Sequence, residues 1–65
     1  MLEPDEVFTK ECCRHLGKVH IVVTHKIHSE HGDGLHKNPS EARDIAILNL
    51  EKRLVRLGLM EENDE

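Results

Sequence analysis

The residues of this chain best suited to metal or acid–base chemistry are its histidines and cysteines. The chain has 65 residues, among them six histidines and two cysteines. The histidines are His15, His20, His25, His28, His31 and His36. Three of them, His25, His28 and His31, follow at intervals of three, so a helix would gather them on one side. Because imidazole is a common zinc ligand, these three are the predicted metal ligands, and the competing interpretation is a polar face exposed to solvent.

The two cysteines are adjacent, at positions 12 and 13. A bridge between neighbours is too strained for a structural disulfide, and neighbouring residues seldom bind the same metal. If this segment is helical, Cys12 lies on an apolar edge with Phe8 and Leu16 as a small core residue, while Cys13 faces away as the candidate reactive thiol. No second group with an acid, base or nucleophile role accompanies Cys13. An enzyme is therefore not predicted, and no catalytic residue is assigned.

A basic arc is predicted in the C-terminal half of the chain. It consists of Arg43, Lys52, Arg53 and Arg56. Such an arc could contact phosphates, but the net charge of −4 disfavours nucleic acid, and no aromatic residue lies between the basic ones. A solvated face is the favoured interpretation, and nucleic-acid binding is the weakest of the functional alternatives.

The strongest structural signal is a helix over residues 38–58. Asn38 suits the N-cap and Pro39 the first helical position, and Glu41 can bond back to the cap amide. Gly58 ends the helix. Two apolar stripes run along it, a broader one of Ala46, Ile47, Leu50, Leu54 and Leu57 and a second one of Ile45, Leu48 and Val55. Because two stripes need two partners, the first is expected to pack on the rest of the chain and the second to form an interface with another copy or a protein partner.

The segments before this helix predict an α+β helix–strand–helix domain. Residues 1–17 are predicted to form a short helix that ends at Gly17, and residues 18–28 a strand rich in β-branched side chains. Residues 29–37 are predicted to form a loop that turns at Gly32 and Gly34.

A lone strand leaves its backbone groups unpaired, so we expect it to pair with the same strand of a second copy in a homodimer. The alternative is an all-α two-helix hairpin, in which the first helix continues to about residue 31 and the chain dimerises as a four-helix bundle. Both interpretations require two copies.

Composition limits the core that this chain can build. It has no Trp or Tyr and one Phe, and a chain of this size buries only about 60% of its unfolded surface. A partner subunit or a metal is therefore expected to supplement the core. Residues 1–60 are the expected single domain, and residues 61–65 an acidic disordered tail.

The sequence has neither an apolar run long enough to span a membrane nor the basic start of a signal peptide, so a cytoplasmic location is expected. The function that these patterns favour is a non-enzymatic protein-interaction or regulatory module that acts as a homodimer. A zinc-binding protein is the alternative.

Overall fold

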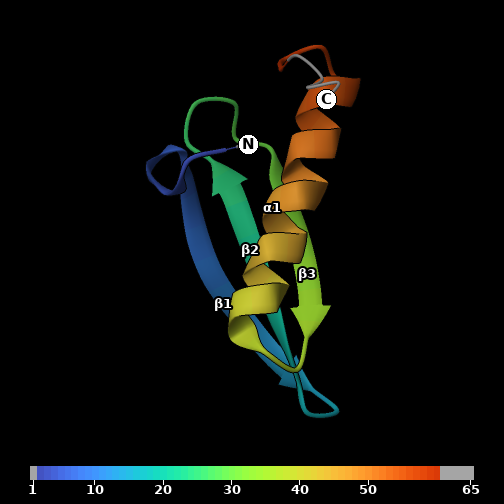
Figure 1. The fold of residues 1–65 in the computed structure, drawn as a ribbon. Helices are drawn as coiled ribbons and strands as arrows, with labels where there is room; N and C mark the ends of the chain where they lie inside the picture. The colour runs from blue at the N-terminus through green and yellow to red at the C-terminus, as the bar shows by residue number, and fades with distance from the viewer. Residues whose placement is uncertain (1, 61–65) are drawn as a thin grey trace.

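The described part of the chain is an antiparallel sheet with one long helix on one of its faces (Figure 1). The structure is a computed structural model, and it describes residues 2–60. Its elements are a 3-10 helix η1 (Pro4–Glu6), the strands β1 (Val7–His15), β2 (Lys18–His25) and β3 (His31–His36), and the helix α1 (Pro39–Arg56). The strands lie side by side in the order β1-β2-β3, so the fold is β-β-β-α.

The predicted first helix over residues 1–17 is wrong, because most of this segment is the strand β1. Leu16 and Gly17 join β1 to β2, and both have positive φ, 53° and 78°. Positive φ at both central residues is the geometry of a two-residue hairpin turn whose twist matches the flanking strands. Gly17 thus adopts a left-handed conformation in a hairpin and not at a helix end. Without the first helix, both the helix–strand–helix prediction and the all-α hairpin alternative are wrong.

The strand predicted over residues 18–28 corresponds to β2, which ends earlier, at His25. β2 is the central strand, and it pairs with β1 on one edge and with β3 on the other. These two neighbours satisfy its backbone hydrogen bonds within one copy of the chain. The predicted pairing of this strand across a homodimer is therefore wrong.

The predicted loop over residues 29–37 is also wrong, because it contains β3. Gly32 and Gly34 pair with Val23 and Ile21 on the side of the sheet that faces α1. A Cβ on Gly32 would lie 2.5 Å from the Leu50 backbone nitrogen, and a Cβ on Gly34 would collide with the Ala42 carbonyl oxygen. The helix backbone lies directly against β3. These two positions of the strand are therefore occupied by glycine, which has no Cβ to collide with it.

The helix α1 begins and ends where the sequence predicts. Asn38 Oδ1 accepts a hydrogen bond from the Ser40 backbone N–H at 2.9 Å, and Gly58 follows the helix with φ 75°. The Asn38 backbone N–H, however, donates to His36 Nδ1 at 3.0 Å and not to Glu41. Glu41 lies 3.0 Å from His36 Nε2, so the His36 ring links the cap to the first turn.

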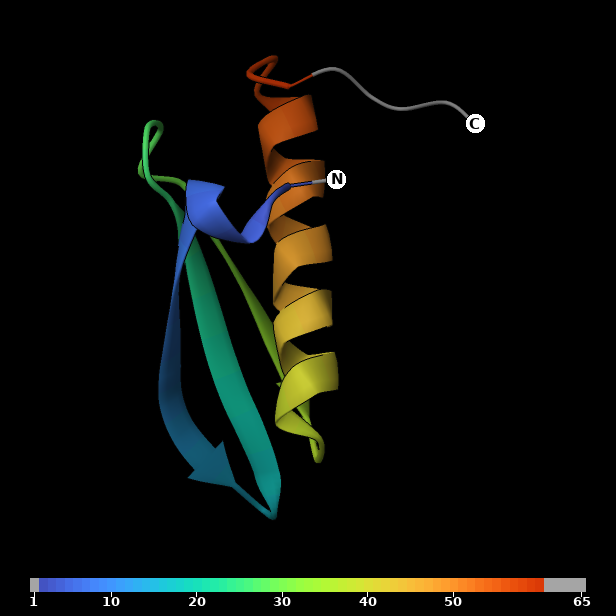
Figure 2. The same cartoon turned by 60° about the vertical axis from the view of Figure 1, so that its left-hand side comes forward.

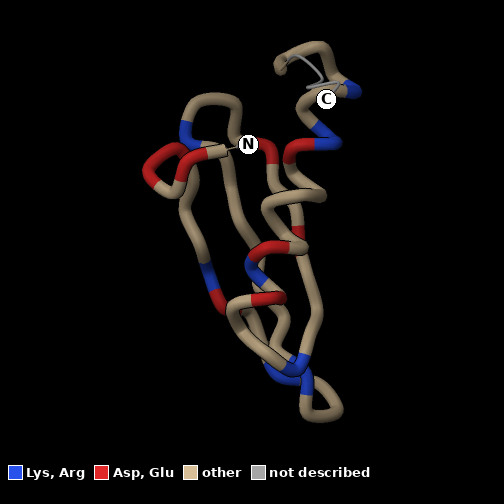
Figure 3. Tube along the Cα trace, in the orientation of Figure 1, with Lys and Arg blue, Asp and Glu red and all other residues tan. Residues whose placement is uncertain are grey.

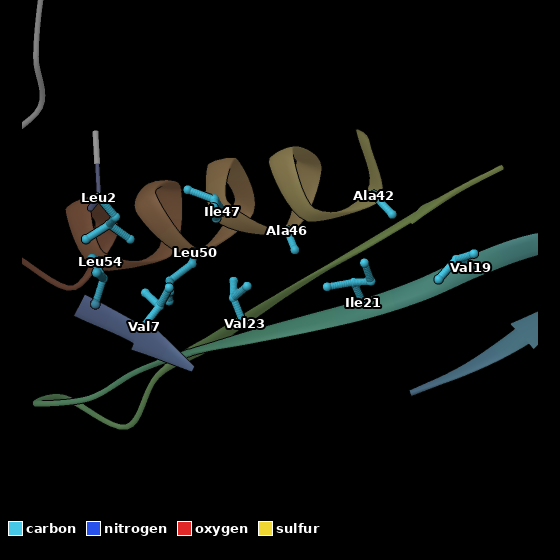
Figure 4. Close-up of a cluster of buried hydrophobic side chains, with 10 residues drawn as sticks. All are labelled: Leu2, Val7, Val19, Ile21, Val23, Ala42, Ala46, Ile47, Leu50 and Leu54. Carbon is cyan, nitrogen blue, oxygen red and sulfur yellow. The ribbon is translucent and has the colours of Figure 1, made fainter. Parts of the chain in front are cut away.

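The core lies between α1 and the sheet (Figure 4). Its buried apolar residues are Leu2, Val7, Val19, Ile21, Val23, Ala42, Ala46, Ile47, Leu50 and Leu54. They include most of the broader predicted stripe, although Leu57 is 51% exposed. α1 packs on β2 and β3, whereas β1 beyond Val7 is exposed to solvent. The other face of the sheet has no described element on it (Figure 2).

No helix within residues 2–60 is long and apolar enough to cross a membrane. The predicted tail over residues 61–65 lies outside the described residues.

Candidate functional site

A β-bulge at Cys12 brings the two thiols together. Glu11 pairs with Ile21 and Cys13 with His20, so Cys12 is an extra residue in β1 that has no partner in β2. In a regular strand, adjacent side chains point to opposite faces, but a bulge changes the direction of a side chain locally. As a result, the Sγ atoms of Cys12 and Cys13 and a ring nitrogen of His20 all lie within 4.8 Å of one another.

His20 connects these thiols to a carboxylate on the third strand. Its Nδ1 lies 4.0 Å from Cys13 Sγ, and its Nε2 lies 2.8 Å from Asp33 Oδ2. An ionised carboxylate only accepts hydrogen bonds, so Nε2 carries the ring proton and donates it to Asp33. Nδ1 then presents its lone pair to the thiols. This arrangement of carboxylate, imidazole and ligand position is the one by which proteins orient metal-binding histidines.

The neighbouring thiol influences the ionisation of Cys13. A hydrogen bond with the Cys12 side chain raises the pKa of Cys13, and partial desolvation and the charge of Cys12 raise it further. A raised pKa keeps the thiol protonated at neutral pH, which makes it a poor nucleophile. A metal ion changes this balance, since a coordinated thiol is deprotonated. The electrostatics therefore disfavour a nucleophilic role for Cys13.

The open face of the sheet forms a shallow hollow around these groups. It is lined by Cys13, Arg14, His15, His20, Asp33 and Leu35. His15 follows Cys13 by two residues and so lies on the same face of β1. Both cysteines are exposed and free, so an ion could reach the thiols from solvent. His15 or a water molecule could complete the coordination.

The chemistry of this donor set is specific. Two thiolates and one imidazole are soft or intermediate ligands, which select zinc(II) or copper(I) over magnesium or calcium. A Cys2His set also leaves one tetrahedral position for a fourth ligand.

No family model, curated protein or solved structure matches this chain.

The structure places the predicted histidine ligands on different parts of the sheet. His25 is buried, and its Nδ1 accepts hydrogen bonds from the backbone N–H groups of Ile27 and His28, each at 3.3 Å. The His25 and His28 rings stack with their centroids 4.9 Å apart. His31 is exposed at the start of β3. Among the described residues, these three do not form a grouped ligand set.

The cysteines differ most from the sequence interpretation. The sequence predicts Cys12 in the core, but it is exposed, as Cys13 is. The signal in the sequence that could have revealed the site is the spacing of Cys13 and His20 about the turn at Leu16–Gly17. Cys13 and His20 lie at equal distances from Leu16–Gly17, which makes them a cross-strand pair once that turn is recognised.

The predicted basic arc is divided in the structure. Lys52, Arg53 and Arg56 line a hollow beside β3, and Arg43 is not part of it. Arg53 Nε donates to Glu30 Oε1 at 2.5 Å, which neutralises one of the three charges locally. Residues of both signs lie along α1, and the basic ones gather at its C-terminal end (Figure 3). This distribution is typical of a solvated helix that complements its own dipole.

Proposed function

We propose that this protein binds one zinc-class metal ion through the Sγ atoms of Cys12 and Cys13 and Nδ1 of His20. The single observation that carries the proposal is the bulge in β1, which turns two adjacent thiols toward a histidine already oriented by Asp33. The three ligands come from neighbouring strands of a paired sheet, so little backbone ordering is needed on binding. The function is metal binding without an assigned reaction.

Titration of the untagged protein with zinc(II) against a chromophoric chelator tests this proposal. We expect one ion per chain. Replacement of zinc by cobalt(II) is expected to give the intense visible bands of a tetrahedral site and a thiolate-to-cobalt charge-transfer band, which report sulfur ligation directly. Binding without the charge-transfer band, or no binding at one equivalent, would overturn the proposal.

Asp33 is expected to act as a positioning residue. Because its carboxylate holds the His20 ring, Asp33→Asn is expected to weaken zinc binding by about 10- to 100-fold, the usual effect of losing such a partner. The cobalt(II) charge-transfer band should survive, since both thiols remain. The matched control is Asp44→Asn, which removes the same charge from α1 away from the site. Equal affinities in the Asp33 and Asp44 variants would contradict this role.

Zinc affinity is expected to fall as the pH falls. The raised pKa of Cys13 means that its thiol is protonated at neutral pH, so zinc must displace that proton. Below the thiol pKa, each displaced proton changes the apparent affinity by up to about tenfold per pH unit. Competition titrations in a non-coordinating buffer from about pH 6 to 8 measure this slope, which a pH-independent affinity would refute.

A homodimeric protein-interaction module is a second candidate function. It is supported by the predicted interface residues Ile45, Leu48 and Val55, which are partly exposed along α1, with Ile45 at the edge beside Gly34 of β3. The two functions use different surfaces, because the thiols lie on the open face of the sheet.

A further inference from the structure

The outer face of α1 carries partly exposed apolar side chains, of which Ile45 lies at the edge, beside Gly34 of β3. Ile45 is 36% exposed and Leu48 is 49% exposed, and Val55 is partly exposed. The sheet lies against the opposite side of the helix, where Ala42, Ala46, Leu50 and Leu54 are buried. Figures 1 and 2 show no described strand or helix on the outer side of α1, and Figure 2 shows the N-terminal segment before η1 crossing the helix.

The spacing on this outer face is that of a coiled coil. Ile45, Leu48, Lys52 and Val55 follow one another at intervals of 3, 4 and 3 residues. These are successive a and d positions of a heptad repeat, with Ile45 and Lys52 at a and Leu48 and Val55 at d. Among parallel coiled coils, a β-branched residue at a with leucine at d favours two helices, and a single lysine at an a position specifies register and oligomeric state at a cost in stability.

The charges flanking this stripe determine the orientation. Glu51 falls at a g position and Arg56 at the following e position. In a parallel pair, each g position faces the e position five residues later on the other helix. Glu51 of each copy therefore lies opposite Arg56 of the other copy, which gives two such pairs in the dimer. In an antiparallel pair, g positions face g positions and e positions face e positions. This brings the two Glu51 side chains toward each other. Only the parallel arrangement pairs opposite charges at the flanking positions, and it does so although the two Lys52 side chains then face each other at the a position.

The described contacts leave both charged groups able to make this pair. Glu51 Oε1 accepts from the Leu2 backbone N–H at 2.9 Å, and its second oxygen has no bond of this kind in the described part of the chain. Arg56 is exposed. The other flanking pair, Asp44 with Asn49, is weaker, because the Asn49 side chain already donates to the Asp33 carbonyl oxygen at 2.7 Å.

We infer that a second copy of this chain docks on the outer face of α1, with the two helices parallel and in register. The inference rests on the second candidate function and is independent of the metal site. The stripe from residue 45 to residue 55 spans only about 15 Å of helix, so the interface is smaller than the roughly 800 Å² per partner of a standard complex. The dimer is therefore expected to be reversible, with dissociation in the micromolar range or weaker.

Sedimentation equilibrium over a range of protein concentrations tests the surface. The protein is expected to show a reversible monomer–dimer equilibrium, which Leu48→Asp abolishes while the circular dichroism spectrum is retained. A protein that stays monomeric at millimolar concentration would overturn both the second candidate function and this inference. A dimer that survives Leu48→Asp unchanged would place the interface elsewhere and would overturn both as well.

Charge reversal tests the orientation separately. Glu51→Lys and Arg56→Glu are each expected to weaken self-association by roughly tenfold, since each turns two attractive pairs into repulsive ones. An equimolar mixture of the two variants should restore association, because both pairs of the mixed dimer are then attractive. The control is Arg43→Glu, which makes the same charge change outside the stripe and should have no effect. A dimer that requires Leu48 but shows no recovery in the mixture would leave the dimer function standing and overturn the parallel arrangement.

Discussion

Gly34→Ala is expected to lower the free energy of unfolding by about 3 kcal/mol or more, at the upper end of what overpacking a core costs. An alanine Cβ at this position would collide with the Ala42 carbonyl oxygen and lie 2.8 Å from the Ala46 nitrogen. Both contacts are with helix backbone, so no side-chain rotation relieves them. The helix would have to move away from β3, which would open the core around Ala42 and Ala46. Urea denaturation followed by circular dichroism measures the loss.

The matched control for Gly34→Ala is Leu35→Ala, the next position on the same strand. Leu35 lies on the open face and is 45% exposed, so its truncation is expected to cost less than about 1 kcal/mol. If Gly34→Ala were as stable as Leu35→Ala, the close approach of α1 to β3 would be refuted. A small domain of this kind has a total stability of only about 5 kcal/mol or somewhat more, so the Gly34 variant is expected to keep about 2 kcal/mol of it and to unfold at a clearly lower urea concentration.

Cys13→Ser is expected to weaken zinc binding by more than about 100-fold, beyond the effect of losing an outer partner such as Asp33. A serine hydroxyl is a hard ligand that does not ionise at neutral pH, so it cannot replace the thiolate. Cys12→Ser should have a comparable effect, because both sulfur atoms lie within 4.8 Å of each other and of a ring nitrogen of His20. In each variant, the cobalt(II) charge-transfer band is expected to lose about half of its intensity, as one of two sulfur ligands is removed.

The control for the cysteine variants is His31→Ala, which removes a predicted ligand from the same open face of the sheet. It is expected to leave zinc affinity unchanged. A large loss in this variant together with none in Cys13→Ser would move the metal site to the histidine series His25, His28 and His31. Unchanged unfolding curves for the cysteine variants would separate a lost ligand from a lost fold, since both thiols are exposed.

The helix α1 could be predicted from the sequence because its signals are local. Asn38 and Gly58 bound it through hydrogen bonds and backbone angles within a few residues of each end. Its buried stripe follows from the helical period alone, and Leu50 and Leu54 are both almost fully buried. The exception is Leu57, which is the C-cap residue and is 51% exposed.

The strands β1 and β3 could not be assigned in the same way, because each depends on a neighbour distant in sequence. The spacing of Phe8, Cys12 and Leu16 imitates a helical edge, but Phe8 is 62% exposed and Leu16 86% exposed. Leu16 is also an unusual residue for a position with positive φ, which hid the hairpin turn. Gly32 and Gly34 resembled a turn because the sequence does not show the helix backbone that lies against them.

The sequence by itself determined the helix, its ends at Asn38 and Gly58 and its apolar spacing, and it favoured a strand over residues 18–28, because these depend on residue type and spacing over a few turns of chain. The tertiary structure decided which strands are neighbours, and one chain supplies both partners of β2. It also decided the candidate metal site, which needs the bulge at Cys12, the pairing of Cys13 with His20 and the approach of Asp33 from β3. These features arise from contacts between separate segments, and local propensity does not encode such contacts.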